Sequence, residues 1–192
     1  KLDLFSDEVY VFTPAGDVYS FPHGATPVDF AYAIHTDVGH HCVGAKTNGR
    51  IVPLKYKLRS GDTVEIITNP DREPSQDWLN FVVSSRAKVK IRSFIKQQQR
   101  QRWMEFGKEV LDRELKRFGL NVNKVIKDGR LQKVAKDLTG REMDDVLAAI
   151  AYGKQDITEV VKGLVGAEKY DEIRSAGKTE EPPRNMFGRL ID

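Results

Sequence analysis

Residues 42–52 read CVGAKTNGRIV, and this stretch decides the fold of the N-terminal part of the chain. Asn48-Gly49 is the strongest short signal for a two-residue hairpin turn, because both residues tolerate the positive φ that such a turn requires. Residues with strand propensity flank the turn on both sides. The stretch therefore predicts strands over residues 42–47 and 50–52, joined as a β-hairpin.

Outward from this hairpin, the sequence predicts one helix and three further strands. The helix begins after Thr26, with Pro27 in the first helical position and Asp29 placed to complete a capping box. It is expected to run to about Asp37. The further strands are expected over residues 8–13, 18–21 and 63–67. The order β-β-α-β-β-β over residues 8–68 is that of a ubiquitin-like β-grasp domain.

After the β-grasp region the sequence pattern becomes helical. Residues 69–77 are polar, contain two prolines and are expected to form a joint. Apolar residues recur at helical spacing from residue 78 on, which predicts a separate all-α domain over residues 78–174 and an α+β fold class overall. Its later helices are expected over residues 122–127, 131–138, 143–152 and 157–165. Residues 1–7 and 175–192 are interpreted as linkers to other parts of a longer chain.

The composition excludes several classes of protein. Apolar residues make up 40% and charged residues 31% of the 192 residues, which is ordinary for a globular protein. No stretch approaches the roughly 18 consecutive apolar residues of a membrane span. The single cysteine, Cys42, excludes an internal disulfide and suits a reducing compartment. We therefore expect a cytoplasmic protein that does not associate with membranes.

Positive charge is concentrated in one part of the chain. Residues 86–102 hold seven basic residues and no acid, although the net charge of the whole chain is only +3. The seven are Arg86, Lys88, Lys90, Arg92, Lys96, Arg100 and Arg102. A local field of one sign attracts a polyanion such as RNA. The alternative is a solvated helix face that serves only solubility.

Four segments of the β-grasp region resemble a TGS domain. They are VFTPAGDV (residues 11–18), TPVDFAYAIH (26–35), GAKTNGRIVPL (44–54) and LRSGDTVEI (58–66). TGS domains also occur in threonyl-tRNA synthetases and in some GTPases, so the residues that follow decide between families.

Those following residues resemble the RelA/SpoT family. DWLNFV (residues 77–82), with Ser85-Arg86-Ala87 and Lys90-Ile91, is similar to the segment after the TGS domain in that family. GKEVL (107–111) and AIAYGK (149–154) are similar to its helical domain. No editing-type sequence follows residue 70, which counts against a threonyl-tRNA synthetase.

The resemblance implies a parent protein of the stringent response, which makes and in most members also degrades the alarmone (p)ppGpp. That parent would be a GTP pyrophosphokinase, a (p)ppGpp 3′-pyrophosphohydrolase, or both. Residues 1–7 would lead from its upstream catalytic half, and residues 175–192 would lead to zinc-finger-like and ACT domains. The present chain would be a regulatory region with no active site and no cofactor.

The resemblance also implies a ligand, the 3′ CCA end of deacylated tRNA on the ribosome. His35 matches the CCA-contacting histidine of the family, and Lys46 and Arg50 flank the hairpin turn where cations could meet phosphates. A helical wheel places His35 on the flank of the apolar stripe, so a histidine that only stabilises the helix C-terminus is the alternative. Contacts to the RNA backbone are expected from Arg86, Lys88, Lys90, Arg92 and Lys96.

Two other partners remain open at this point. The TGS face could bind acyl carrier protein, because an acidic protein would suit the same basic surface. The region could also dock on the catalytic domains of its own parent and restrain them. Docking on the catalytic domains is compatible with binding of either tRNA or acyl carrier protein.

The sequence predicts no metal site and no catalytic motif. His40, His41 and Cys42 are consecutive, so they cannot easily converge on one ion, and no second ligand pair follows. No nucleophile motif occurs. Gly177-Lys178-Thr179 resembles the end of a phosphate loop, but Glu172 occupies the position of its first glycine, which argues against a TGS-bearing GTPase.

Overall fold

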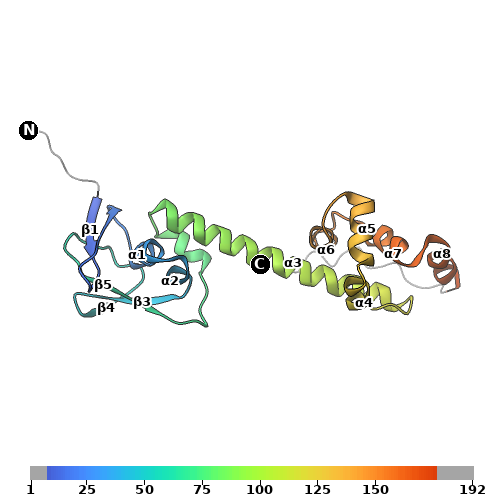
Figure 1. Ribbon diagram of the computed structural model, residues 1–192, viewed down its shortest axis with the longest axis horizontal. Helices are drawn as coiled ribbons and strands as arrows, with labels where there is room; N and C mark the ends of the chain where they lie inside the picture. Colours follow the sequence, from blue (N-terminus) through green and yellow to red (C-terminus); the bar gives the residue numbers. More distant parts are fainter. Residues whose placement is uncertain (1–7, 177–192) are drawn as a thin grey trace, which may run out of the picture. The chain divides into compact units, whose positions relative to one another are not determined.

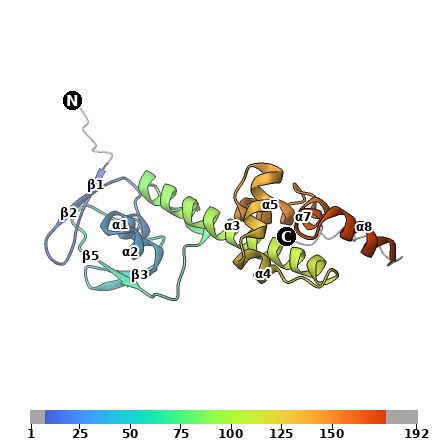
Figure 2. The ribbon, with the colours of Figure 1, turned by 45° about the vertical axis from the view of Figure 1, so that its right-hand side comes forward.

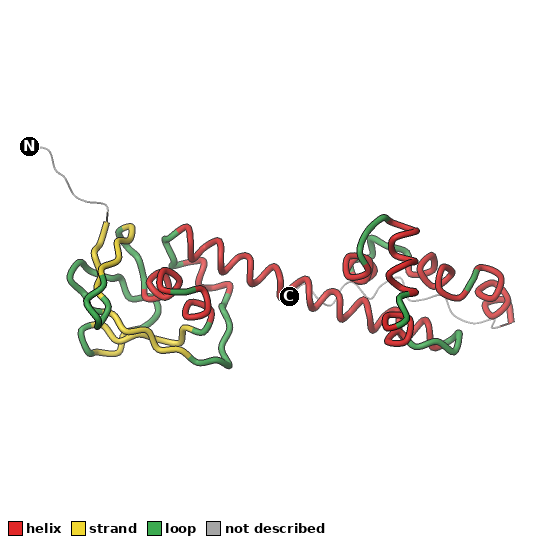
Figure 3. The backbone as a smooth tube through the Cα atoms, viewed as in Figure 1, coloured by secondary structure: helices red, strands yellow, loops and turns green. Residues whose placement is uncertain are grey.

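The computed structural model describes residues 8–176, which divide into two compact units between Gln99 and Arg100 (Figure 1). The division falls within a single long helix, α3 (Ser85–Lys116). The strands of the described residues all belong to the first unit, and the second unit is helical (Figure 3). This confirms the predicted α+β class. The predicted N-terminal linker, residues 1–7, lies outside the described residues. The predicted C-terminal linker, residues 175–192, lies outside them from residue 177 on.

The strands of the first unit form two antiparallel groups. Their bounds are β1 (Glu8–Phe12), β2 (Val18–Pro22), β3 (Cys42–Thr47), β4 (Arg50–Val52) and β5 (Val64–Thr68). β1 pairs with β2, and β3 lies between β4 and β5. A parallel bridge from Phe12 to Thr63 connects β1 with the start of β5, and the Phe12 N–H donates to the Asp62 carbonyl at 2.8 Å. The strand order β2-β1-β5-β3-β4 is that of a β-grasp.

The hairpin turn that decides the fold has the expected geometry. Asn48 and Gly49 have φ values of 51° and 79°. Positive φ at both central residues defines the turn type whose twist matches that of the flanking strands. The side-chain oxygen of Asn48 also accepts from the Thr63 N–H at 2.9 Å, which ties the turn to the strand start on the other side of β3.

The predicted helix over residues 27–37 is two helices, and the prediction was wrong at this point. α1 (Pro27–Ile34) ends at His35, whose φ of −158° and ψ of 151° are extended, and α2 (Thr36–His40) begins after it. The His35 N–H still donates to the Ala31 carbonyl at 3.2 Å, while the His35 side chain caps α2. A helical period does not reveal such a break, because the residues on both sides remain helical.

Helix α1 covers one side of the strands, as Figures 1 and 2 both show. Its apolar side chains divide between two clusters. Phe30 packs with strand residues such as Val11, Phe21, Ala45 and Val64. Val28, Ala31 and Tyr32 pack with Trp78, Val82, Ala87 and Ile91, which belong to the short helix η1 (Gln76–Asn80), the segment after it and the start of α3. The first part of α3 is therefore built into the first unit.

One buried carboxylate joins α1 to the start of α3. Asp29 is 1% exposed and accepts from both the N–H and the hydroxyl of Thr26 at 2.9 Å, which completes the predicted capping box. It also accepts from the N–H groups of Val83 (3.1 Å) and Ser84 (2.7 Å). The Ser84 hydroxyl in turn accepts from the Ala87 N–H in the first turn of α3. Asp29 thus fixes the point from which α3 departs.

The second unit is a bundle of short helices on the second part of α3. They are α4 (Val122–Lys127), α5 (Arg130–Thr139), α6 (Met143–Ala151), α7 (Ile157–Val165) and α8 (Ala167–Ala176). Leu111 and Leu115 of α3 are fully buried in its core, and Phe118 packs beside them. α8 was not predicted, because Tyr170 is its only buried residue and Ile173 the only other large apolar side chain, which is too short a pattern to indicate a helix.

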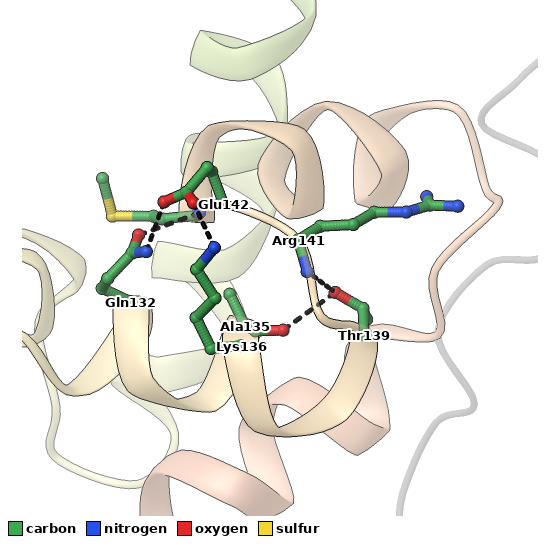
Figure 4. Close-up of polar contacts among 7 residues, drawn as sticks. Gln132, Ala135, Lys136, Thr139, Arg141 and Glu142 are labelled. Carbon is green, nitrogen blue, oxygen red and sulfur yellow. Dashed lines mark hydrogen bonds and ion pairs between the residues drawn. The ribbon is translucent and has the colours of Figure 1, made fainter.

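A polar contact orders the connection between α5 and α6 (Figure 4). Gln132 accepts from the Met143 N–H at 3.0 Å, which satisfies a donor at the start of α6. Glu142 accepts from Lys136 and from Gln132. The hydrogen bond from Lys136 and then that from Gln132 hold the pKa of the Glu142 carboxyl below its ordinary value. The contact is exposed, so it orders the loop and adds little stability.

Replacing Gly107 by alanine is expected to destabilise the second unit by about 1–2 kcal/mol. A Cβ at this position would lie 1.9 Å from the carbonyl oxygen of Leu147, a backbone atom that cannot rotate away. Overpacking costs about 1–3 kcal/mol, and the gain of up to about 1 kcal/mol from replacing a helical glycine offsets part of it. Urea unfolding followed by circular dichroism measures the loss. Gly163→Ala is the control, because its Cβ would meet a side-chain methyl of Val134 at 2.8 Å. Equal stability of the two variants would contradict the expectation.

Candidate nucleic-acid interface

His35 lies at the junction of α1 and α2 with its side chain 65% exposed. Its Nδ1 accepts from the Asp37 N–H at 3.2 Å, as the side chain of an N-cap residue does. In the neutral ring the proton then resides on Nε2, which can donate to a ligand. The Asp37 carboxylate is 3.5 Å from the same Nδ1. The backbone thus fixes the ring on one side and leaves a donor on the other, and the contact of His35 with a CCA end stays a prediction.

The register of the hairpin places Lys46 and Arg50 on opposite faces. Lys46 is paired with Ile51 and Glu65, on the face of the sheet turned away from α1. Arg50 is paired with Thr47, which is buried. Side chains opposite each other in a ladder share a face, so the two cations do not form one joint phosphate site on the strands. Their predicted role as CCA contacts stays a prediction.

The basic residues of α3 surround a narrow buried stripe. Ala87 and Ile91, four residues apart, are fully buried, and the cations share the rest of the helix surface with uncharged side chains such as Val89. Arg86, Lys90, Arg92 and Lys96 are exposed, and Lys88 is half-buried. Arg100 is engaged with Asp145 of the second unit at 2.7 Å. The structure therefore presents the five predicted backbone-contacting cations on one continuous helix.

Length alone does not make α3 a membrane span. It has 32 residues, but its surface is dominated by charged and amide side chains. Across residues 8–176, no helix is both long enough and apolar enough to cross a membrane.

His40, His41 and Cys42 are held by three different sets of neighbours. The His40 Nδ1 lies 2.9 Å from the Tyr32 hydroxyl, and the His41 Nδ1 lies 2.8 Å from the carbonyl of Arg72. Cys42 is 1% exposed, and burial raises the pKa of its thiol to about 11. Within the described part of the chain, no group of three or more His, Cys, Asp or Glu side chains is arranged to hold a metal ion.

A pocket that sequence reasoning missed lies beside these histidines. It has a volume of about 210 Å³ and is lined by His40 and His41, by residues 70–74 of the joint and by Phe94 of α3. The three segments are far apart in the sequence, and none carries a motif. His40 and His41 are adjacent in the sequence, but no pattern links them to the joint or to Phe94, so the pocket could not be predicted before the fold was known.

Comparison with protein-family models gives two matches. Residues 9–68 match the TGS domain, and residues 94–165 match the RelA/SpoT AH domain. Together they cover the β-grasp strands and most of the helical part.

Comparison with curated proteins gives relatives of much greater length. The chain is 56% identical over 183 residues to a GTP pyrophosphokinase of Myxococcus xanthus, covering 95% of the chain and 24% of that relative. It is 44% identical over 179 residues to a guanosine-3′,5′-bis(diphosphate) 3′-pyrophosphohydrolase of Aquifex aeolicus, covering 93% and 25%. It is 43% identical over 167 residues to a bifunctional (p)ppGpp synthase/hydrolase of Mycobacterium tuberculosis, covering 86% and 23%. The chain spans about a quarter of the length of these relatives.

Proposed function

The chain belongs to the RelA/SpoT family, as a TGS domain followed by a RelA/SpoT AH domain, and from this premise we propose that it is the regulatory region of a (p)ppGpp synthetase/hydrolase. Its TGS domain senses the 3′ CCA end of deacylated tRNA on the ribosome, and the catalytic domains of the parent respond. The observation that carries the proposal is His35, an exposed ring held at Nδ1 by the backbone and presenting Nε2–H.

The geometry of His35 suits a ribose or phosphate oxygen at the end of an RNA chain. A neutral imidazole that donates from Nε2 can bind either oxygen without carrying a charge that would attract any polyanion. An esterified amino acid converts a terminal ribose hydroxyl into an ester, whose oxygen is a poorer acceptor for the Nε2–H of His35, and it adds bulk. A buried partner left unsatisfied in this way costs about 1–3 kcal/mol. Charged tRNA should therefore bind less well than deacylated tRNA.

Helix α3 supplies attraction that does not depend on sequence. Its exposed cations lie in the first half of the helix, after the TGS domain, the joint and η1, and its first turn contains no acid. Long-range attraction of this kind raises the rate of encounter with RNA and depends strongly on salt. Recognition of the tRNA end would then fall to the TGS domain.

The basic run of α3 is expected to contribute a slope of roughly −2 to −3 to log K against log salt, if three or four cations reach phosphates. Replacing Lys88, Arg92 and Lys96 together by glutamine should flatten the slope measured by RNA binding at several salt concentrations. Replacing the exposed Lys124, Lys127 and Lys133 of the second unit is the matched control, because the change in charge is the same. An unchanged slope in the α3 variant would mean that the basic residues of α3 form a solvated face that does not contact RNA.

A binding comparison tests the proposed function. Ribosomes programmed with deacylated or charged tRNA in the A site are mixed with the chain, and acyl carrier protein is offered in a parallel titration. We expect deacylated tRNA to increase binding to the ribosome by roughly 5- to 150-fold over charged tRNA. Tight binding of acyl carrier protein, with no dependence on the state of the tRNA, would replace the proposal with the protein-interaction alternative.

A further inference from the structure

The pocket beside α2 is lined by apolar side chains and by the polar residues 71–73 of the joint, here named the polar wall. Pro70 and Pro74 of the joint and Phe94 of α3 supply the apolar surface, and His40 and His41 close the side formed by α2. Asp71, Arg72 and Glu73 add two carboxylates and a guanidinium from consecutive residues. All of these residues belong to the first unit. Small-molecule and ring-binding sites have this composition, with a few placed polar groups in an apolar hollow.

Two aromatic rings meet in the pocket wall and are held in place. The ring centroids of His40 and Phe94 are 4.8 Å apart with an interplanar angle of 50°. The Tyr32 hydroxyl lies 2.9 Å from the His40 Nδ1, and the Tyr32 ring packs against His40 from another side. Burial lowers the pKa of His40, with His41 and Lys90 adding to the effect and Asp37 opposing it. His40 is thus an uncharged ring at neutral pH, and a planar ligand can contact it and Phe94 without meeting a buried charge.

The polar wall is anchored by hydrogen bonds of its own. The Arg72 carbonyl lies 2.8 Å from the His41 Nδ1, and the Asp71 N–H donates to the Asn69 side chain at 2.9 Å. Gln98 of α3 donates to the Glu73 carboxylate at 3.4 Å. The segment is therefore held against α2 and α3, while carboxylate oxygens remain able to accept from an amino group.

We propose that this pocket binds one base of a single-stranded RNA, stacked on Phe94 and bearing an exocyclic amino group that Asp71 or Glu73 accepts. Carboxylates are the natural acceptors for the amino groups of bases, and uracil has none. The same carboxylates repel phosphate, so the base edge must face them and the RNA backbone must pass on the other side. The exposed Lys90, one helical turn before Phe94 and close enough to influence His40 electrostatically, is the cation that would contact that backbone.

This inference deepens the proposed function and rests on it for one point, the source of the base in the unpaired end of a tRNA. His35 and the pocket lie at opposite ends of α2, a helix of five residues, so one unpaired strand can reach both. His35 would read the terminal group, and the pocket would read a base.

The test measures binding of labelled short oligoadenylate, oligocytidylate and oligouridylate, with AMP as a further arm, to the chain alone. Oligoadenylate and oligocytidylate are expected to bind better than oligouridylate. Phe94→Ala should weaken oligoadenylate binding by about 5- to 150-fold, the usual effect of losing one stacked base. Phe94→Trp should restore it. Tyr10→Ala is the matched control, because Tyr10 is an exposed aromatic residue on β1, outside the pocket.

A second variant keeps the pocket filled. Asp71→Asn with Glu73→Gln preserves size and should bring the preference for oligoadenylate over oligouridylate close to one, with the same unfolding curve as the wild type. The proposal is overturned if oligoadenylate does not bind the wild-type chain at up to about 1 mM, or if AMP binds as tightly as oligoadenylate. It is also overturned if Phe94→Ala binds oligoadenylate as well as the wild type does. A double variant that keeps the preference for oligoadenylate over oligouridylate would overturn it too. These outcomes leave intact the dependence of ribosome binding on His35, which is measured separately and decides the proposed function alone.

Discussion

Replacement of His35 by glutamate is expected to abolish most of the preference of the chain for ribosomes carrying deacylated rather than charged tRNA. Glutamate lacks the Nε2–H donor and places a negative charge where an RNA oxygen must approach. The wild-type preference, worth about 1–3 kcal/mol or roughly 5- to 150-fold, should fall to near unity. The ratio of the two affinities is the quantity to measure, because it does not depend on the electrostatic attraction that α3 adds to both.

Two further variants separate ligand binding from capping. Asparagine is among the best N-cap residues, so His35→Asn should preserve the cap on α2 but remove the Nε2 donor. If His35 contacts the tRNA end, this variant loses the preference with little loss of stability. His23→Glu introduces the same charge at an exposed turn residue before α1 and should change the ratio much less. An unaltered ratio in His35→Glu would show that His35 does not sense the CCA end, and an unaltered ratio in His35→Asn would reduce it to a capping residue.

Replacing Asp29 by alanine is expected to destabilise the first unit by roughly 3 kcal/mol or more. The substitution leaves the N–H and hydroxyl of Thr26 and the N–H groups of Val83 and Ser84 without their acceptor. An unsatisfied buried donor costs about 1–3 kcal/mol, and water entering the vacated space recovers part of the total. Urea unfolding measures the loss.

Asp17→Ala is the matched control for Asp29→Ala. Asp17 is exposed, and its carboxylate accepts only from the Thr13 hydroxyl at 3.4 Å, while its own N–H donates to that hydroxyl oxygen at 3.0 Å, within the same turn. Its removal should change stability by about 0.5 kcal/mol or less. Comparable losses in the two variants would mean that Asp29 serves only its local cap. A loss confined to Asp29→Ala, together with altered amide resonances at the start of α3, would establish that it joins the two segments.

The sequence predicted most of what local chemistry determines. Asn48-Gly49 predicted the hairpin because the backbone there has few alternatives, and Thr26, Pro27 and Asp29 predicted the start of α1 for the same reason. What it missed depends on distant residues. The bonds from Asp29 to Val83 and Ser84 span more than 50 residues and have no local signature.

The candidate site shows the same division. His35 could be found by its resemblance to a known motif, but its extended backbone and its role as the cap of α2 could not, because a helical wheel assumes a continuous helix. Lys46 and Arg50 both flank the hairpin turn in the sequence, whereas the ladder register puts them on different faces. The pocket had no signal at all, since its walls meet only after α2, the joint and α3 have packed.

The burial of Cys42 links the rate of its alkylation to the opening of the first unit. Its thiol is 1% exposed and its pKa is raised to about 11, so an alkylating reagent at neutral pH reacts only when the first unit opens. Because the chain contains no second cysteine, the rate of alkylation under native conditions reports the frequency of that opening. Any ligand that binds the closed first unit slows the reaction in proportion to its occupancy. The binding of an RNA end to the unlabelled protein could thus be measured from the rate at which Cys42 is alkylated.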